Sequence, residues 1–177
     1  FFGELETNFY KRNGKELSYN NLVDVDSAVS LMAEFKNSEP TFAILKHTNA
    51  CGLAKRPTVL QAWKDALAAD PVSAFGGVLI CNKQIDEATA REIDELFYEV
   101  LIAPSFSDEA LAVLSAKKNR ILLQLHTYPK ATQQVKSILD GYIVQDMDQM
   151  TLDMATIKEA TNRKPTKTEM DDLLYAN

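Results

Sequence analysis

The sequence is poor in the residues that build metal sites and disulfide frameworks, with only two cysteines and two histidines in 177 residues. Cys51 and Cys81 lie in different segments and share no metal-ligand spacing. This argues against a zinc site and against a disulfide scaffold. A cytosolic protein with buried thiols is the simplest interpretation.

Long apolar runs and excess positive charge are also absent. No stretch approaches the roughly 18 apolar residues that a membrane span needs. The net charge of -6 argues against nucleic acid or a membrane surface as a partner, because binding of their phosphates needs a basic face. No G-x-G-x-x-G loop occurs either, which weakens the hypothesis of an unrelated nucleotide-binding α/β domain.

The size and composition fit one soluble globular core. Hydrophobic residues make up 46% of the chain and charged residues 25%. Residues 1–4 are neither a start methionine nor the beginning of a signal peptide. The final predicted helix runs to Asn177 without a stop signal. We therefore expect a chain cut from something larger at both ends.

Short apolar segments alternate with helical patterns along the chain. The predicted strands are Thr41–Leu45, Gly76–Cys81, Val100–Pro104, Ile121–Leu125 and Ile143–Met147. The predicted helices are Val25–Phe35 with Asp24 or Asp26 as its cap, one between Pro57 and Asp70, Ala88–Phe97 capped by Asp86, one from Ser107 through Lys118, and one opened by a Thr166–Glu169 capping box. Such alternation predicts an α/β fold with a mostly parallel or mixed sheet covered on both faces. Thr127–Asp140 receives no assignment, since its helical pattern is weak.

The pair Lys46–His47 is the most informative feature. It follows the β-prone run Thr41–Leu45 and precedes Asn49–Gly52, which we interpret as a glycine turn. The pair then lies at a strand's carboxyl end, where open α/β sheets bind ligands. Lysine can stabilise developing negative charge, and histidine suits proton transfer near neutral pH. From these residues alone, a solvated lysine and a histidine bonded to a backbone carbonyl remain an open alternative.

Three ordered motifs, with an Ile-Ala-Pro stretch after them, cover most of the chain: Gly14–Leu22 (GKELSYNNL), Lys46–Gly52 (KHTNACG), Asp70–Gly77 (DPVSAFGG) and Ile102–Pro104. Together they resemble the signatures of AICAR transformylase, the formyl-transferring half of a bifunctional purine-biosynthesis protein. Ala50 stands where the family usually has proline. This loosens a φ restraint but removes no chemical group.

The resemblance implies a three-layer α/β/α sandwich of the cytidine-deaminase-like type. Residues 1–165 would form the first of two such units, and 166–177 would begin the connection to the second. The implied reaction moves a formyl group from the co-substrate 10-formyltetrahydrofolate to the 5-amino group of AICAR, giving FAICAR. The parent protein would be a cytoplasmic homodimer that also carries an IMP cyclohydrolase domain. A basic segment that precedes this region in the family is not in the sequence.

The resemblance also implies roles for individual residues. His47 would accept the proton of the substrate amine, and Lys46 would support charge or proton movement at the same centre. The expected substrate contacts are Asn21, Phe75, Gly76 and Glu99, and the expected supporting loop contains Asn49 and Gly52. Some positions also have a purely structural alternative. For Asn49 it is the organisation of loop amides, for Gly77 a strand-entry turn, and for Glu99 a carboxylate on the surface.

Two further chemistries are disfavoured. Cys51 invites a nucleophile hypothesis, but transfer from a formyl donor to an amine needs no covalent enzyme intermediate, so a small buried thiol is preferred. Zinc deaminases use H-x-E followed by P-C-x-x-C. Here Thr48 and Asn49 follow His47, and no Pro-Cys pair occurs, so no metal is expected.

A rival hypothesis of another class is a catalytically incomplete ligand-binding or assembly fragment of the same enzyme. It follows from the missing segments that complete the family's pocket. Turnover by this chain alone separates the two hypotheses.

Overall fold

The structure is a computed structural model that describes residues 3–148 and 157–176. The chain divides into two compact units, residues 1–129 and 130–177. The predicted boundary lies between residues 165 and 166 and does not coincide with this division. Assignment of residues 1–165 to one deaminase-like unit stays a prediction.

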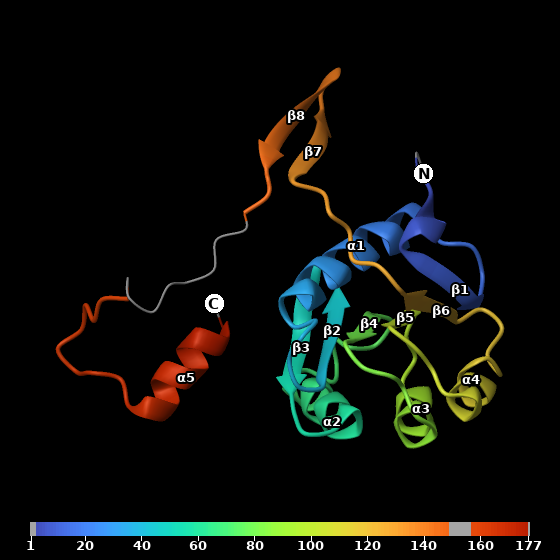
Figure 1. Cartoon of the computed structure of the whole chain (residues 1–177), viewed down its shortest axis with the longest axis horizontal. Helices are drawn as coiled ribbons and strands as arrows, with labels where there is room; N and C mark the ends of the chain where they lie inside the picture. The colour runs from blue at the N-terminus through green and yellow to red at the C-terminus, as the bar shows by residue number, and fades with distance from the viewer. Residues whose placement is uncertain (1–2, 149–156, 177) are drawn as a thin grey trace. The chain divides into compact units, whose positions relative to one another are not determined.

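The first unit is built on a six-stranded sheet in the order β1-β6-β5-β4-β2-β3 (Figure 1). Its strands are β1 (Phe9–Asn13), β2 (Thr41–Lys46), β3 (Asn49–Lys55), β4 (Val78–Cys81), β5 (Val100–Ala103) and β6 (Ile121–Leu125). Only β4–β5 and β5–β6 pair in parallel, whereas β1–β6, β2–β3 and β2–β4 are antiparallel. The sheet is therefore mixed rather than mostly parallel.

Helices cover both faces of this sheet, as Figure 1 shows. The helices of this unit are α1 (Tyr19–Glu34), α2 (Val59–Ala69), α3 (Glu87–Asp94) and α4 (Asp108–Leu114), and a short 3-10 turn (η1, Leu5–Thr7) precedes β1. One apolar cluster joins α1 to alternate strand residues such as Ala43 and Ile80. The other joins α2, α3 and α4 to the intervening residues such as Phe42 and Leu79. Successive side chains of each buried strand thus point alternately into the two apolar clusters. The predicted three-layer α/β/α sandwich is confirmed.

Most helix starts were predicted correctly because capping residues mark them. Thr58, Asp86 and Ser107 each accept a hydrogen bond from the backbone N–H three residues later. The predicted start of α1, at Val25, was wrong. It begins at Tyr19, because Ser18 and Asn21 form a reciprocal capping box a full turn and more before the expected caps. Helices α3 and α4 end three and four residues earlier than expected.

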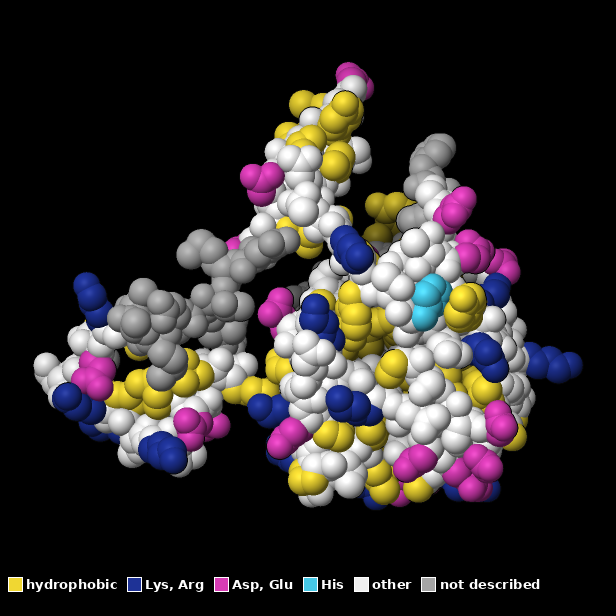
Figure 2. Space-filling model, viewed as in Figure 1, with side chains coloured by type: hydrophobic (Ala, Val, Ile, Leu, Met, Phe, Trp, Pro, Cys, Tyr) yellow, Lys and Arg dark blue, Asp and Glu magenta, His cyan; other side chains and the backbone are white. Residues whose placement is uncertain are grey.

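The second unit contains a hairpin of β7 (Gln133–Ile138) and β8 (Gly141–Asp146) and the helix α5 (Lys167–Ala176). The predicted Thr166–Glu169 capping box opens α5. The fifth predicted strand is β8, but it pairs with β7 and not with the main sheet. Every residue of both hairpin strands is exposed, and Figure 2 shows apolar side chains along it. Met147 lies just beyond the observed strand.

The structure also contains strands that the sequence did not predict: β1, β3 and β7. The most consequential is β3, because it includes the segment interpreted as a glycine turn. The true turn is only His47–Thr48, and Lys46 pairs directly with Asn49.

Candidate active site

A pocket of about 640 Å³ lies where β2 ends and α1, β4 and β5 begin. It is lined by Lys15, Ser18, Tyr19, Asn20, Asn21, Val23, Asp24, Lys46, His47, Thr48, Gly76, Val78 and Glu99. The predicted residues Asn21, Lys46, His47, Gly76 and Glu99 are all in this set. Phe75, Asn49 and Gly52 are not.

The pocket's place in the sheet differs from the usual α/β arrangement. As predicted, Lys46–His47 lies at the carboxyl end of a strand. However, β2 runs antiparallel to β4, with Leu45 opposite Val78. The pocket therefore opens at the amino ends of the parallel strands, whereas doubly wound sheets bind ligands at their carboxyl ends.

A two-residue turn between β2 and β3 presents His47. Both turn residues have positive backbone φ, 53° at His47 and 65° at Thr48. The Thr48 N–H donates to Asp24 Oδ1 at 2.8 Å, and Asn49 Nδ2 donates to the His47 carbonyl at 3.0 Å. Asn49 therefore organises the turn from the first position of β3, which is a structural role rather than a place in the pocket wall.

Lys46 joins this turn to the loop before β4. Its Nζ donates to the carbonyl oxygen of Phe75 at 2.8 Å. An ammonium has three protons to donate, so this bond leaves donors for a ligand. The loop itself begins with Asp70, whose Oδ1 accepts the Ser73 N–H at 2.9 Å. Hydrogen bonds from Ser73 hold the pKa of the Asp70 carboxyl below its ordinary value.

Gly76 is part of the pocket lining, whereas the neighbouring Phe75 is not. Gly76 lines the pocket with a φ of 75°, and its N–H donates to the Phe97 carbonyl at 2.8 Å. The Phe75 ring is not a core ring, since the residue is 57% exposed. It packs against the ring of Phe97 with centroids 5.1 Å apart. Gly77 has a packing role, because an added Cβ would lie 2.8 Å from the Leu45 carbonyl oxygen.

Asn21 and Glu99 form a further part of the pocket lining. Asn21 is only 6% exposed, and its Nδ2 donates to Glu99 Oε2 at 2.7 Å. Its Oδ1 accepts from the N–H of Ser18 at 3.1 Å, which completes the cap of α1. Lys15 Nζ lies 3.9 Å from Glu99 Oε2. The Glu99 carboxylate is thus held by a buried amide and a neighbouring cation.

Gly52 and Cys51 belong to the packing of β3 against α2. A Cβ at Gly52 would lie 1.9 Å from the backbone oxygen of Ala66, so only glycine fits between strand and helix. Gly52 lies inside strand β3 rather than in a loop, and its supporting role for the site stays a prediction. Cys51 packs partly buried against the core, and this burial raises the pKa of its thiol. That is the environment of a structural thiol rather than a nucleophile.

Sequence reasoning did not propose eight of the pocket's thirteen lining residues, among them Lys15, Tyr19, Asp24 and Thr48. One signal was available for Asp24, which follows Asn21 by three residues and so lies on the same face of a helix. It was instead interpreted as a helix cap. Among residues 3–148 and 157–176, no group of three or more His, Cys, Asp or Glu side chains is arranged to hold a metal ion.

The pocket combines an imidazole, two ammonium groups, two carboxylates and two side-chain amides. An imidazole can exchange a proton, and a lysine can stabilise an anionic intermediate in the same cavity. A carboxylate held by an amide can in turn orient a polar ligand. This set can move a proton, stabilise negative charge and orient a polar ligand in one cavity.

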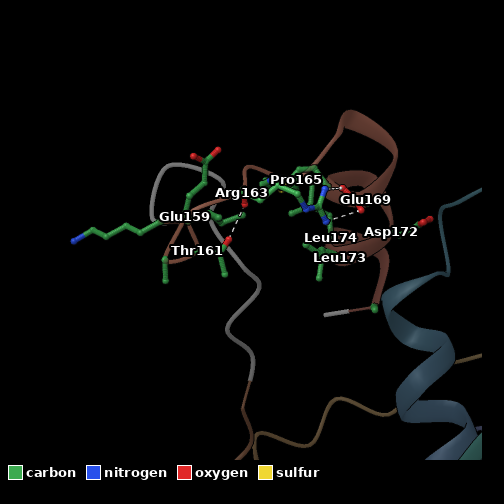
Figure 3. Close-up of a pocket in the computed structure, with 13 residues that line it drawn as sticks. Glu159, Thr161, Arg163, Pro165, Glu169, Asp172, Leu173 and Leu174 are labelled. Carbon is green, nitrogen blue, oxygen red and sulfur yellow. Dashed lines mark hydrogen bonds and ion pairs between the residues drawn. The ribbon is translucent and has the colours of Figure 1, made fainter.

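A second, more apolar hollow of about 870 Å³ lies within residues 157–176 (Figure 3). The guanidinium of Arg163 donates to both carboxylate oxygens of Glu169 there, each at 2.9 Å. None of the predicted site residues lines this hollow. Within the described part of the chain, no helix has the length and apolar character needed to cross a membrane.

The family model and the curated relatives agree with each other on the family. The family model of the AICARFT/IMPCHase bienzyme matches residues 3–177. The bifunctional purine biosynthesis protein PurH of Bacteroides thetaiotaomicron is 51% identical over 177 residues, which is 100% of this chain and 34% of that protein. PurH of Acetivibrio thermocellus is 44% identical over 168 residues, 93% of this chain and 32% of that protein. The chain thus spans about a third of the length of these relatives.

Among solved structures, the dCMP deaminase of the cyanophage S-TIM5, in complex with dCMP and dUMP, covers 60% of this chain and 98% of its own. The sequences are 12% identical and the TM-score is 0.43. That score is too low to carry an argument about fold, and the deaminase-like type stays a prediction.

Proposed function

The chain belongs to the AICARFT/IMPCHase bienzyme family, and from that premise we propose that its pocket contributes to formyl transfer from 10-formyltetrahydrofolate to the 5-amino group of AICAR. The observation that carries the proposal is the convergence of the predicted residues. Asn21, Lys46, His47, Gly76 and Glu99 come from separate segments and line one pocket.

The chemistry assigned to these residues is an addition followed by an elimination. The amine nitrogen attacks the formyl carbon, and a C–N bond forms as the carbonyl electrons move to oxygen. His47 takes the proton that the amine loses, and the Lys46 ammonium stabilises the oxyanion. The bond from the formyl carbon to the folate nitrogen then breaks, and that nitrogen takes a proton. The products are FAICAR and tetrahydrofolate.

Binding roles follow from the contacts of the residues in and beside the pocket. Glu99, held by Asn21 at 2.7 Å, is the acceptor for a donor group of the substrate. Gly76 lets a planar ligand approach the backbone, because it has no Cβ. Phe75 supplies a stacking surface outside the pocket wall, beside Phe97. No metal takes part in the proposed reaction.

The wider setting is part of the same proposal. The parent protein is a cytoplasmic homodimer, and its IMP cyclohydrolase activity resides in a domain outside this chain. The relatives are named as bifunctional purine biosynthesis proteins, which supports the presence of a second activity in the parent.

A second candidate function is a catalytically incomplete binding or assembly fragment. Two observations favour it: the chain spans about a third of its relatives, and the β7–β8 hairpin exposes apolar residues including Val135, Tyr142 and Ile143. Formyl transfer by the 177-residue chain alone, measured beside the full-length parent, separates the candidates. We expect no appreciable turnover by the chain alone. Turnover within tenfold of the parent would show that its own residues suffice.

The test of the catalytic assignment uses His47→Ala in the full-length parent. We expect the rate to fall by about 10²–10⁴, the usual range for a general acid or base, with a much smaller change in AICAR affinity. Lys46→Met should also depress turnover. A near-wild-type rate for His47→Ala would remove the imidazole from the mechanism, and unaltered kinetics for Lys46→Met would leave the lysine a structural residue.

A further inference from the structure

The turn that presents His47 has an unfavourable sequence for its conformation. Two-residue hairpin turns with positive φ at both positions favour Asn-Gly or Asp-Gly. Here the positions are His47 at 53° and Thr48 at 65°. Threonine is β-branched, and such residues are outliers at positive φ. A turn of this kind persists only where surrounding groups hold it, and such strained turns cluster at functional sites.

The group that holds this turn from another element is Asp24. Its Oδ1 accepts the backbone N–H of Thr48 at 2.8 Å, a hydrogen bond assisted by the carboxylate charge. Two further side-chain hydrogen bonds of the turn, from Asn49 Nδ2 and Thr48 Oγ1 to the His47 carbonyl, are local to the hairpin. Of these contacts, only that of Asp24 ties the turn to the rest of the fold.

We infer that Asp24 is a positioning residue, which fixes the His47–Thr48 turn so that the imidazole keeps its place in the pocket; this rests on the proposed function of His47. Asp24 follows Asn21 by three residues, so both project from one face of α1. Asn21 binds Glu99 and Asp24 binds the turn. One helix therefore binds both the Glu99 carboxylate and the turn that carries His47.

The helix is well suited to that task because it is firmly seated on the sheet. Its inner face is buried through Val25, Ala28, Val29 and Met32. A side chain on such a rigid element fixes its partner more closely than a loop residue does. Small displacements of a catalytic group cost rate steeply, by about 10²-fold for one ångström. Loss of Asp24 should therefore affect rate more than binding.

The first measurement is amide hydrogen exchange on the 177-residue chain, with no substrate and no activity involved. Asp24→Ala should raise the exchange rate of the Thr48 amide by about tenfold, since it removes one charge-assisted hydrogen bond. The core amides of β2 should keep their protection. Asp26→Ala is the matched control, because Asp26 is exposed on the same helix two residues away. Equal Thr48 exchange in the two variants would overturn the inference.

The second measurement is the kinetics of the full-length parent. Asp24→Ala should lower kcat by about 10- to 100-fold with little change in KM for AICAR. Asp24→Asn keeps an oxygen that can accept the Thr48 N–H, so it should retain most of the rate. In the Asp24→Ala background, Thr48→Gly should restore part of the rate, because glycine adopts positive φ without strain.

These results distinguish a positioning role from a direct one. If Asp24→Asn is as slow as Asp24→Ala and Thr48→Gly restores nothing, the carboxylate acts on the substrate and the inference is wrong. A full rate for His47→Ala refutes the proposed function instead, and the exchange result on the chain alone still reports whether Asp24 holds the turn.

Discussion

The contact between Asn21 and Glu99 predicts a pH-dependent loss of stability when Asn21 is replaced by aspartate. The replacement places a second carboxylate against Glu99 Oε2, where the Nδ2 donor now lies at 2.7 Å. Two unit charges about 4 Å apart repel by about 4 kcal/mol at an effective dielectric constant near 20. The side chain of Glu99 is 38% exposed, so solvent reduces this cost. We expect a net loss of about 2–3 kcal/mol at pH 7.

The sign of the pH dependence follows from linkage. Like-charge repulsion raises the folded-state pKa of the carboxyl pair above its unfolded value of about 4. The variant is therefore least impaired below about pH 4, where the pair holds a proton. It loses stability as the pH rises through the raised folded pKa. Asn21→Ala removes the hydrogen bond to Glu99 without adding a charge, so it should cost less stability at pH 7 than Asn21→Asp does.

Urea unfolding of the 177-residue chain between pH 4 and pH 8 measures this effect. Asn20→Asp is the matched control, since it adds the same charge one residue earlier on an exposed position of α1. Near the start of a helix that charge is mildly favourable. If both aspartate variants give the same stability at every pH, Glu99 is not held by Asn21 and this part of the pocket lining is wrongly described.

Two further substitutions test the assignments next to the pocket. Gly52→Ala should cost about 3 kcal/mol or more by thermal or urea unfolding, because its Cβ would lie 1.9 Å from a backbone oxygen of α2. Gly141→Ala is the control, with nothing within 4 Å of the added atom; equal effects would refute the close-packing account. Phe75→Ala should weaken ligand binding in the parent yet change stability by less than about 1 kcal/mol, because the residue is 57% exposed. A large fall in melting temperature with unchanged affinity would show that the ring serves the fold instead.

The sequence predicted the core strands and the helix caps because these signals are local. The apolar runs of β2, β4, β5 and β6 are buried on both faces, so they stand out as short continuous segments. Capping residues then mark where most helices start. Ser18 was missed because its partner is Asn21, whereas the usual capping box has a glutamate or glutamine at that position.

Strand β3 was missed for a physical reason that also concerns the site. Asn49 and Gly52 are typical turn residues, whereas the true turn, His47–Thr48, contains none of the usual ones. The turn was therefore placed two residues too late. Contacts with α1 help to hold this turn, and such tertiary contacts leave no local signal in the sequence.

The motif resemblance predicted many residues of the candidate site, but it did not predict their geometry. The motifs brought Asn21, Lys46 and His47 into one prediction, and the pocket places them together. They did not indicate that β2 runs antiparallel to its neighbour β4. They also did not reveal Asp24, whose role depends on a hydrogen bond to a residue 24 positions away.

The central claim is that the pocket between α1 and the β2–β3 turn binds AICAR. The most direct measurement is an NMR titration of the 177-residue chain with AICAR, which follows each backbone amide. We predict weak binding, with a Kd near the millimolar range that corresponds to roughly -4 kcal/mol. The shifts should be confined to the pocket, with the largest at Asn21, His47, Gly76 and Glu99. Shifts that gather in residues 157–176, or none in the pocket at saturating AICAR, would contradict the account.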